Sequence, residues 1–147
     1  MDNKNEKESL EFNKGWLQGV AYLEFGHAIA YAVLAVLVFV LANGTEIAQN
    51  AFNVTEPIAG MSIEVVACIT GVISAIVSVF LGILILKSLK PGASKLALVV
   101  EIIAFVSVFI TGIYQFITPG FSWSLAISSF IDVITVGAAE YIRKNNK

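Results

Sequence analysis

Four long runs of apolar residues, separated by short polar segments, dominate the pattern of this chain. The runs cover about residues 17–42, 62–86, 96–117 and 121–142. Because an α-helix rises about 1.5 Å per residue, about 20 apolar residues are enough to cross the hydrocarbon layer of a bilayer. A helix that is apolar on every side is typical of a membrane span rather than of a soluble domain. The pattern therefore predicts an all-α protein, a four-helix transmembrane bundle with up-down-up-down topology.

The polar segments set the limits of the membrane domain. Residues 1–15 are expected to form a polar cytoplasmic tail that becomes helical from Ser9. Residues 16–142 are expected to form the membrane domain, and residues 143–147 a basic cytoplasmic tail. Trp16 lies at the first boundary, where an aromatic side chain typically anchors a helix to the membrane–water interface.

The connections between the apolar runs contain turn and helix signals. The longest connection, 43–61, is expected to include a short interfacial helix over 45–54 that buries Ile47, Ala51 and Phe52. Pro91 and Gly92 stop one helix and turn the chain into the next. Residues 118–120 are expected to form a tight turn, which is too short to join anything but two antiparallel neighbours.

The distribution of charge predicts the orientation of the chain. Charged residues make up only 14% of the sequence, against roughly 25% in a typical soluble domain, so we expect lipid to cover much of the surface. All nine basic residues lie in the segments 1–15, 87–95 and 143–147, whereas 43–61 and 118–120 contain none. Four spans bring the three basic segments to one side of the membrane. Since segments rich in lysine and arginine are typically on the cytoplasmic side, both termini are predicted to be cytoplasmic in a multi-pass protein of the cell membrane.

The residues that the sequence lacks disfavour several classes of function. The single cysteine, Cys68, allows neither an internal disulfide nor a CxxC metal motif. The sequence contains no GxSxG, HExxH or Walker-type motif and no Cys/His pair, and its polar connections are too short to build a substrate pocket. No basic stretch interleaved with aromatic residues suggests nucleic acid as a partner. We therefore expect a protein that is not an enzyme, uses no cofactor and does not bind nucleic acid.

Four ionisable residues within the predicted spans are the candidates for chemistry. Glu24 and His27 lie in the first span, Glu101 in the third and Asp132 in the fourth. A charged group at the centre of a span costs about 2.5–3.5 kcal/mol on insertion scales, so such residues are typically functional or paired. At the helical rise, Asp132 lies roughly 16 Å from Arg143, which places it near the middle of the bilayer.

Helical spacing places the candidates on three stripes. The first holds Val20, Glu24, His27 and Tyr31, the second Glu101, Ala104, Val108, Gly112 and Gln115, and the third Ser128, Asp132 and Thr135. If all three stripes face inward, they converge on the cytoplasmic half of the bundle. Glu140 is expected instead to be a solvated interfacial group that pairs with Arg143 or Lys144.

Three hypotheses remain open for the four candidates. In the first, they form hydrogen bonds between helices and specify packing or contact with a partner, each bond contributing about 1–2 kcal/mol or less. In the second, Asp132, Glu101 and Glu24 couple protons or cations to transport, with His27 as a relay. In the third, the same residues bind a metal ion. The di-iron pattern of helical bundles needs two Glu-x-x-His motifs, and the chain has a single histidine, so only a site for one metal ion is possible.

The second span carries a stripe of small residues. The stripe consists of Ala67, Gly71, Ser74, Ser78 and Gly82. Small residues at this spacing let another helix approach closely, so we expect packing against a neighbouring helix of the chain, with contact between copies as the alternative. The function that the sequence favours is a non-catalytic membrane subunit or homo-oligomeric bundle, whose partners are the lipid bilayer and copies or a larger membrane complex. A small proton- or cation-coupled transporter is the alternative, and a mononuclear metal-binding bundle is the third hypothesis.

Overall fold

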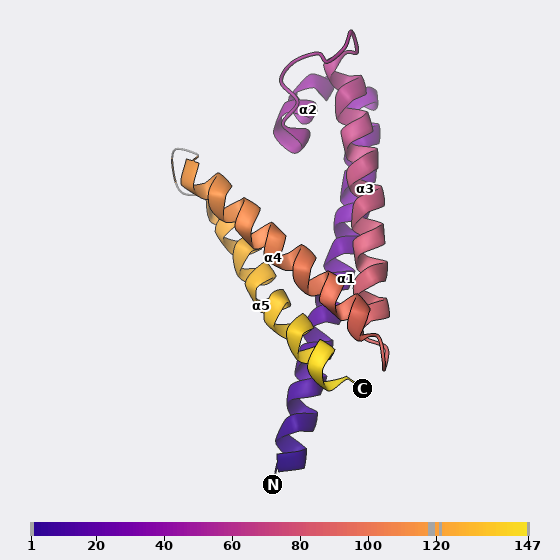
Figure 1. The fold of residues 1–147 in the computed structure, drawn as a ribbon. Coiled ribbons are helices and arrows are strands. Elements are labelled where there is room, and N and C mark those ends of the chain that lie inside the picture. Colours follow the sequence, from indigo (N-terminus) through magenta and orange to yellow (C-terminus); the bar gives the residue numbers. More distant parts are fainter. Residues whose placement is uncertain (1, 118–119, 121, 147) are drawn as a thin grey trace. The chain divides into compact units, whose positions relative to one another are not determined.

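The computed structural model describes residues 2–117, 120 and 122–146. Five helices follow one another along the chain (Figure 1), namely α1 (Asp2–Val40), α2 (Gly44–Phe52), α3 (Ile63–Ser88), α4 (Ser94–Ile117) and α5 (Trp123–Asn145). No strand occurs in these ranges, so the predicted all-α class is confirmed. By length and composition, α1, α3, α4 and α5 are each able to cross a membrane.

The first helix begins earlier than expected. Its first residue is Asp2 rather than Ser9, so most of the polar N-terminal segment is continuous with the first span. The turn expected at 118–120 includes Thr118 and Pro119, which lie outside the described residues, as does Phe121, the expected start of the fourth span.

The short helix expected in the long connection is present as α2. The helix buries Ala48 rather than Ala51. As expected, Ile47 and Phe52 are partly buried, and they pack against the hydrophobic cluster that contains Ala48. The helix is followed by Asn53, whose φ of 55° is left-handed. Asparagine tolerates this conformation, which lets the backbone N–H groups beyond the helix bond back to its last carbonyl groups.

The chain forms two compact units, and α1 and α3 contribute to both. Unit 1 consists of the chain up to Ala21 and from Ile83 onward. Its buried core is formed by Leu17, Ala21, Ile85, Ala97, Val100, Ala138, Ala139 and Ile142. Alanine occupies half of these positions, and side chains of this size let helices pack at short distance. Figure 1 shows α4 and α5 side by side over most of their length.

The end of α5 is tied to the turn between α3 and α4 in unit 1. The N–H of Gly92 donates a hydrogen bond to the carbonyl oxygen of Asn146 at 3.2 Å, and Asn146 Nδ2 donates to the carbonyl oxygen of Leu89 at 2.9 Å. The basic segment 87–95 therefore lies beside the C-terminal residues of the chain.

Unit 2 covers Tyr22–Gly82 and contains the rest of α1 and α3 with α2 between them. Its buried core is formed by Val38, Ala48, Val54, Val66 and Ala67. Gly44 opens α2 so close to α1 that a Cβ atom there would lie 1.9 Å from the carbonyl oxygen of Val38. Only glycine fits this position, which allows α2 to fold back at once after the first span.

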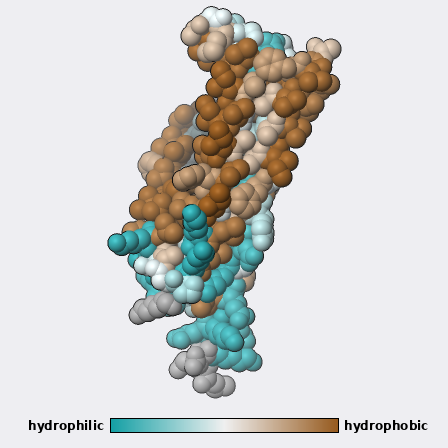
Figure 2. Space-filling view, turned by 90° about the vertical axis from the view of Figure 1, so that its right-hand side faces the viewer, coloured by the Kyte–Doolittle hydropathy of each residue, from teal (hydrophilic) through white to brown (hydrophobic). Residues whose placement is uncertain are grey.

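The surface along the four long helices is largely apolar. In the most apolar stretch of each helix, only 17–22% of the residues are buried, and large side chains such as Phe80, Phe109 and Phe116 are exposed. Figure 2 shows hydrophobic side chains along the helices on the visible face, with hydrophilic ones around the N-terminal part of α1. Apolar surface of this extent is a liability in water and is expected where lipid tails are the solvent.

Candidate functional site

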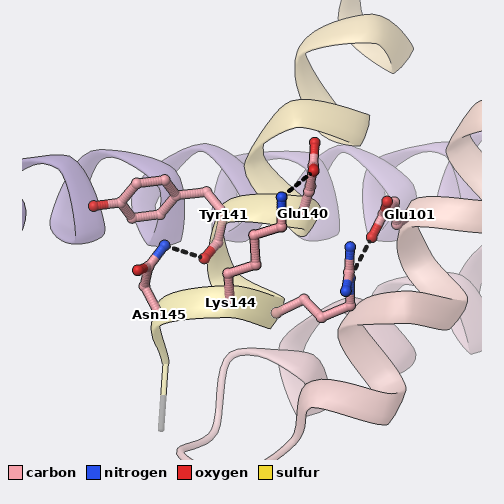
Figure 3. A network of polar contacts seen from close by, with 6 residues as sticks. Glu101, Glu140, Tyr141, Lys144 and Asn145 are labelled. Atoms are coloured by element: carbon pink, nitrogen blue, oxygen red, sulfur yellow. Dashed lines mark hydrogen bonds and ion pairs between the residues drawn. The ribbon is translucent and has the colours of Figure 1, made fainter.

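Glu101 forms an ion pair that joins α4 to α5 in unit 1. Arg143 Nε donates a hydrogen bond of 2.8 Å to Glu101 Oε2, and the two side chains are 31% and 19% exposed. In Figure 3, Glu101 points from α4 toward the last turns of α5. The arginine neutralises this carboxylate, so Glu101 is not a free acid within the apolar region.

Other polar groups among the described residues near the end of α5 pair within that helix. Lys144 Nζ bonds to Glu140 Oε1 one turn earlier, and Asn145 Nδ2 donates to the carbonyl oxygen of Tyr141 at 2.9 Å (Figure 3). Of the two partners that the sequence allowed for Glu140, the structure places Lys144 in contact. Arg143 is thereby available to Glu101 on the facing helix.

Asp132 lies near the middle of α5 and bonds to α4. Ser107 Oγ donates a hydrogen bond of 2.6 Å to Asp132 Oδ2. Thr111 lies one turn further along α4. Ser129 Oγ of α5 donates a hydrogen bond of 2.9 Å to Thr111 Oγ1, and the threonine hydroxyl donates to the carbonyl oxygen of Ser107 at 2.7 Å. We call these four residues, Ser107, Thr111, Ser129 and Asp132, the polar seam. The seam joins α4 and α5 through short polar side chains that lie within the apolar runs of both helices.

A tryptophan from α1 contacts α5 one turn from Asp132. Trp16 Nε1 donates a hydrogen bond of 3.1 Å to Thr135 Oγ1, and this hydroxyl bonds to the carbonyl oxygen of Ile131 at 2.8 Å. Thr135 is buried and Trp16 is half-buried. Trp16 therefore connects α1 to α5, whereas its expected role as an interfacial anchor stays a prediction.

The structure does not bring Glu101 and Asp132 together, contrary to the expected convergence of their stripes. Glu101 contacts Arg143, whereas Asp132 contacts Ser107. The cause is the antiparallel course of α4 and α5, which sets the start of α4 against the end of α5. Asp132 and Arg143 are separated by roughly 16 Å along α5, so the two carboxylates belong to different levels of the hairpin.

Glu24 and His27 lie one turn apart on the part of α1 that belongs to unit 2. His27 Nδ1 is 3.9 Å from Glu24 Oε2, and the side chains are 50% and 22% exposed. The His27 ring also lies 6.4 Å from the ring of Tyr31, measured between centroids. The residues thus share one face of the helix, and each has a neighbour from α1 itself.

The small residues of α3 lie against other parts of unit 2. Ala67, Gly71, Ser78 and Gly82 are buried, and Ser74 is half-buried. A Cβ atom at Gly71 would lie 2.9 Å from Ala35 Cβ and 2.8 Å from the ring of Phe52. At Gly82 it would lie 2.7 Å from the ring of Phe25. The stripe therefore faces α1 and α2 of the same chain.

Comparisons with protein-family models, curated proteins and solved structures found no significant match. The residues themselves therefore carry the argument about function. Across the described residues, no three His, Cys, Asp or Glu side chains are grouped closely enough to hold a metal ion. Glu101 and Asp132, two of the four weak metal candidates, contact an arginine and a serine instead.

Two features of the site escaped the sequence analysis. The two seam residues of α4, Ser107 and Thr111, were not singled out, although their spacing of four residues places both on one face of α4. Arg143 was assigned to the basic cytoplasmic tail and to a pair with Glu140, although a long side chain at the end of one helix reaches the start of an antiparallel neighbour. A search for polar residues that become opposite one another in a helical hairpin would have found both.

Proposed function

We propose that this chain is a small multi-pass protein of the cell membrane, with both termini in the cytoplasm, that acts as a non-catalytic membrane subunit or homo-oligomeric bundle. One observation carries the proposal. Both carboxylates in the apolar part of unit 1, Glu101 and Asp132, bond to a side chain of the facing helix. Hydrogen bonds of this type fix the register of neighbouring spans, and that is the role expected of a packing residue.

The exposed apolar surface supports assembly with other spans. Helices of which so little is buried present broad faces to lipid or to further helices. The proposed topology rests on the confinement of the nine basic residues to three segments. Two hydrogen bonds support it, from the Gly92 N–H to the Asn146 carbonyl oxygen and from Asn146 Nδ2 to the Leu89 carbonyl oxygen, because they hold two of those segments at the same end of unit 1.

The test is the state of the protein after mild extraction from its native membrane. We expect the tagged chain to be recovered in an assembly larger than the monomer, detected by size-exclusion chromatography with light scattering and by crosslinking before extraction. Recovery as a solitary monomer under both conditions would contradict the proposal.

Proton- or cation-coupled transport is the second candidate, and Asp132 favours it. This residue lies near the middle of its span and contacts a neutral hydroxyl rather than a basic group. If transport is the function, Asp132→Asn leaves the fold intact and abolishes flux in proteoliposomes. Glu101→Gln is the comparison, because Glu101 is already neutralised by Arg143. Absence of flux in the parent protein, across a proton or sodium gradient, would rule the candidate out.

A further inference from the structure

Three lysines surround the turn between α3 and α4 in unit 1. Lys87 lies in the last turn of α3, Lys90 in the connection and Lys95 in the first turn of α4, and all three are exposed. The segment 87–95 contains no acidic residue. None of the ion pairs among the described residues includes these lysines. The turn therefore presents three cations that no ion pair within the described part of the chain neutralises.

The acidic residues at the same end of unit 1 are balanced by other cations. Glu101 bonds to Arg143, and Glu140 bonds to Lys144. In the N-terminal segment, residues 2–14, four acidic residues face three lysines in the count of charges, so the segment is close to neutral. The unbalanced charge at this end is thus the positive charge of the turn.

The backbone that carries the three lysines is held by the end of α5. Asn146 Nδ2 donates hydrogen bonds to the carbonyl oxygens of Leu89 at 2.9 Å and Lys90 at 3.2 Å. The N–H of Gly92 donates to the carbonyl oxygen of Asn146 at 3.2 Å. The lysines therefore extend from a preorganised turn, which lowers the entropic cost of binding a ligand there.

Apolar residues follow the lysines toward the middle of the predicted spans. Leu98 and Val99 lie one turn beyond Lys95 on α4, and each is 41% exposed. Ile83 lies one turn before Lys87 on α3 and is also 41% exposed. Cations at the end of an apolar surface match a phospholipid, whose headgroup lies at the interface and whose acyl chains lie in the hydrocarbon layer.

All of these residues belong to unit 1. Gly82 is the last residue of unit 2, and α3 continues from it as one helix to Ser88, about 9 Å further along the helix axis. Lys90 and Lys95 therefore lie beyond the end of the helix through which the chain leaves unit 2.

We propose that the turn at 87–95 binds the headgroup of an anionic glycerophospholipid of the membrane in which the chain lies. Lysine side chains beside a membrane surface attract anionic lipids, and the attraction grows with the number of cations. The three lysines would contact the headgroup phosphate, and the acyl chains would lie along Leu98 and Val99. The choice of leaflet rests on the proposed orientation, which places this lipid in the cytoplasmic leaflet, where anionic lipids are found.

Two other occupants fit the turn less well. An acidic segment of a soluble protein would match the lysines but would leave Leu98 and Val99 without a partner of their own polarity. A second copy of the chain would bring the same three lysines to the contact, and like charges repel. A phospholipid satisfies both the cations and the apolar residues.

The test measures which lipids lie beside the turn. The full chain, with Cys68→Ser and a small fluorescent dye at Ser94→Cys, is reconstituted in phosphatidylcholine vesicles that contain increasing fractions of a nitroxide-labelled lipid. Ser94 is exposed, and a nitroxide quenches the dye only at short range. The labelled lipid is phosphatidylglycerol or, as the matched control, phosphatidylcholine. We expect half-maximal quenching at an about tenfold lower fraction of phosphatidylglycerol, which corresponds to about 1.4 kcal/mol.

Variants of the turn test the role of its lysines. The triple change Lys87→Gln, Lys90→Gln and Lys95→Gln should bring quenching by phosphatidylglycerol to the level of phosphatidylcholine. Arginine at the same three positions keeps the charge and should retain the preference. Raising the salt concentration from about 0.05 M to about 0.5 M should weaken the preference in the parent, because exposed charges are screened. Circular dichroism checks that each variant folds.

The N-terminal segment offers a matched control. Lys4→Gln, Lys7→Gln and Lys14→Gln together remove the same charge from a segment in which acidic residues already balance the lysines. We expect this variant to change the lipid preference by less than about twofold at physiological salt.

Several outcomes would overturn the proposal. They are equal quenching by the two lipids, a preference that persists in the glutamine variant of the turn, and an equal loss in the N-terminal control, which would mean that only the net charge of the chain matters. Displacement of the labelled lipid by soluble glycerol phosphate at millimolar concentration would show that the ligand is not a lipid. A chain that shows no lipid preference but is still recovered in a larger native assembly retains the proposed function and loses only this site.

Discussion

Arg143 and Glu101 lie 42 residues apart in the chain, yet the arginine Nε atom is 2.8 Å from the glutamate Oε2 atom. The contact joins the last turns of α5 to the first half of α4 at the border of the apolar region. Glu101, which the sequence analysis named as a candidate for ion coupling, is therefore paired with Arg143.

Removing one partner of this pair is expected to destabilise the helical hairpin. Arg143→Gln leaves the Glu101 carboxylate in a largely apolar place without its counter-charge, and we expect the apparent Tm to fall by roughly 2–4 °C. Glu101→Gln should cost less, because the arginine at the end of α5 can reach water. The double variant should be more stable than the sum of the two single changes predicts, measured by thermal unfolding in detergent.

The neighbouring exposed pair provides the control. Lys144→Gln removes the contact with Glu140, whose side chain is 44% exposed, and exposed pairs one turn apart on a helix contribute little. Its Tm should remain within about 1 °C of the parent. A shift as large as that of Arg143→Gln would mean that general charge at the end of α5 matters, not the specific contact.

The number and class of the elements followed from the sequence because hydropathy alone sets them. Apolar runs of this length have no alternative to helix in a bilayer, where every backbone polar group must be bonded within its own segment. The start of α1 was placed too late, since nothing at Ser9 separates the polar residues Lys4 to Lys14 from the same continuous helix. Polar composition predicted the solvent exposure of this segment and not its backbone conformation.

The candidate site was predictable residue by residue but not as an arrangement. Asp132 and Glu101 were recognisable as ionisable groups in apolar runs, yet their partners depend on the axial register between α4 and α5. A shift of one helical turn would replace Ser107 with another residue opposite Asp132. That register is set by the packing of small residues such as Ala97 and Ala139, and a single sequence contains no direct record of it.

Gly71 is predicted to be a packing requirement of unit 2. In Gly71→Ala, the new methyl group would lie 2.8 Å from the ring of Phe52, which can rotate, and 2.9 Å from Ala35 Cβ, which moves only with its backbone. We expect overpacking to destabilise the protein by about 1–3 kcal/mol, measured by unfolding in mixed micelles. A stabilised Gly71→Ala variant would contradict the close approach of α1 and α3.

Glycines of the other spans supply the matched control for this change. A Cβ atom at Gly112 on α4 or Gly137 on α5 would have no neighbour within 4 Å. Because alanine has the higher helix propensity, Gly137→Ala should be neutral or stabilising by up to about 1 kcal/mol. The same outcome is expected for Gly112→Ala.

The bond from Trp16 to Thr135 is expected to contribute measurably to unit 1. Trp16→Phe keeps an aromatic ring but removes the Nε1–H donor, and we expect a loss of about 0.5–1.5 kcal/mol in the free energy of unfolding. Thr135→Val removes the acceptor with little change in shape. The effects of the two changes should not be additive, and full additivity in the double variant would show that the bond contributes nothing.

Orientation in the membrane can be tested by cysteine labelling. In a Cys68→Ser background, Glu56→Cys reports on the long connection after α2 and Lys90→Cys on the turn between α3 and α4, and both native side chains are exposed. If the basic segments are cytoplasmic, a membrane-impermeant maleimide should label Glu56→Cys in intact cells and Lys90→Cys only after permeabilisation. Asn145→Cys must behave like Lys90→Cys, because the hydrogen bonds of Asn146 hold the end of α5 against that turn. Labelling of Lys90→Cys in intact cells would reverse the proposed orientation, and disagreement between Lys90→Cys and Asn145→Cys would contradict the structure of unit 1 itself.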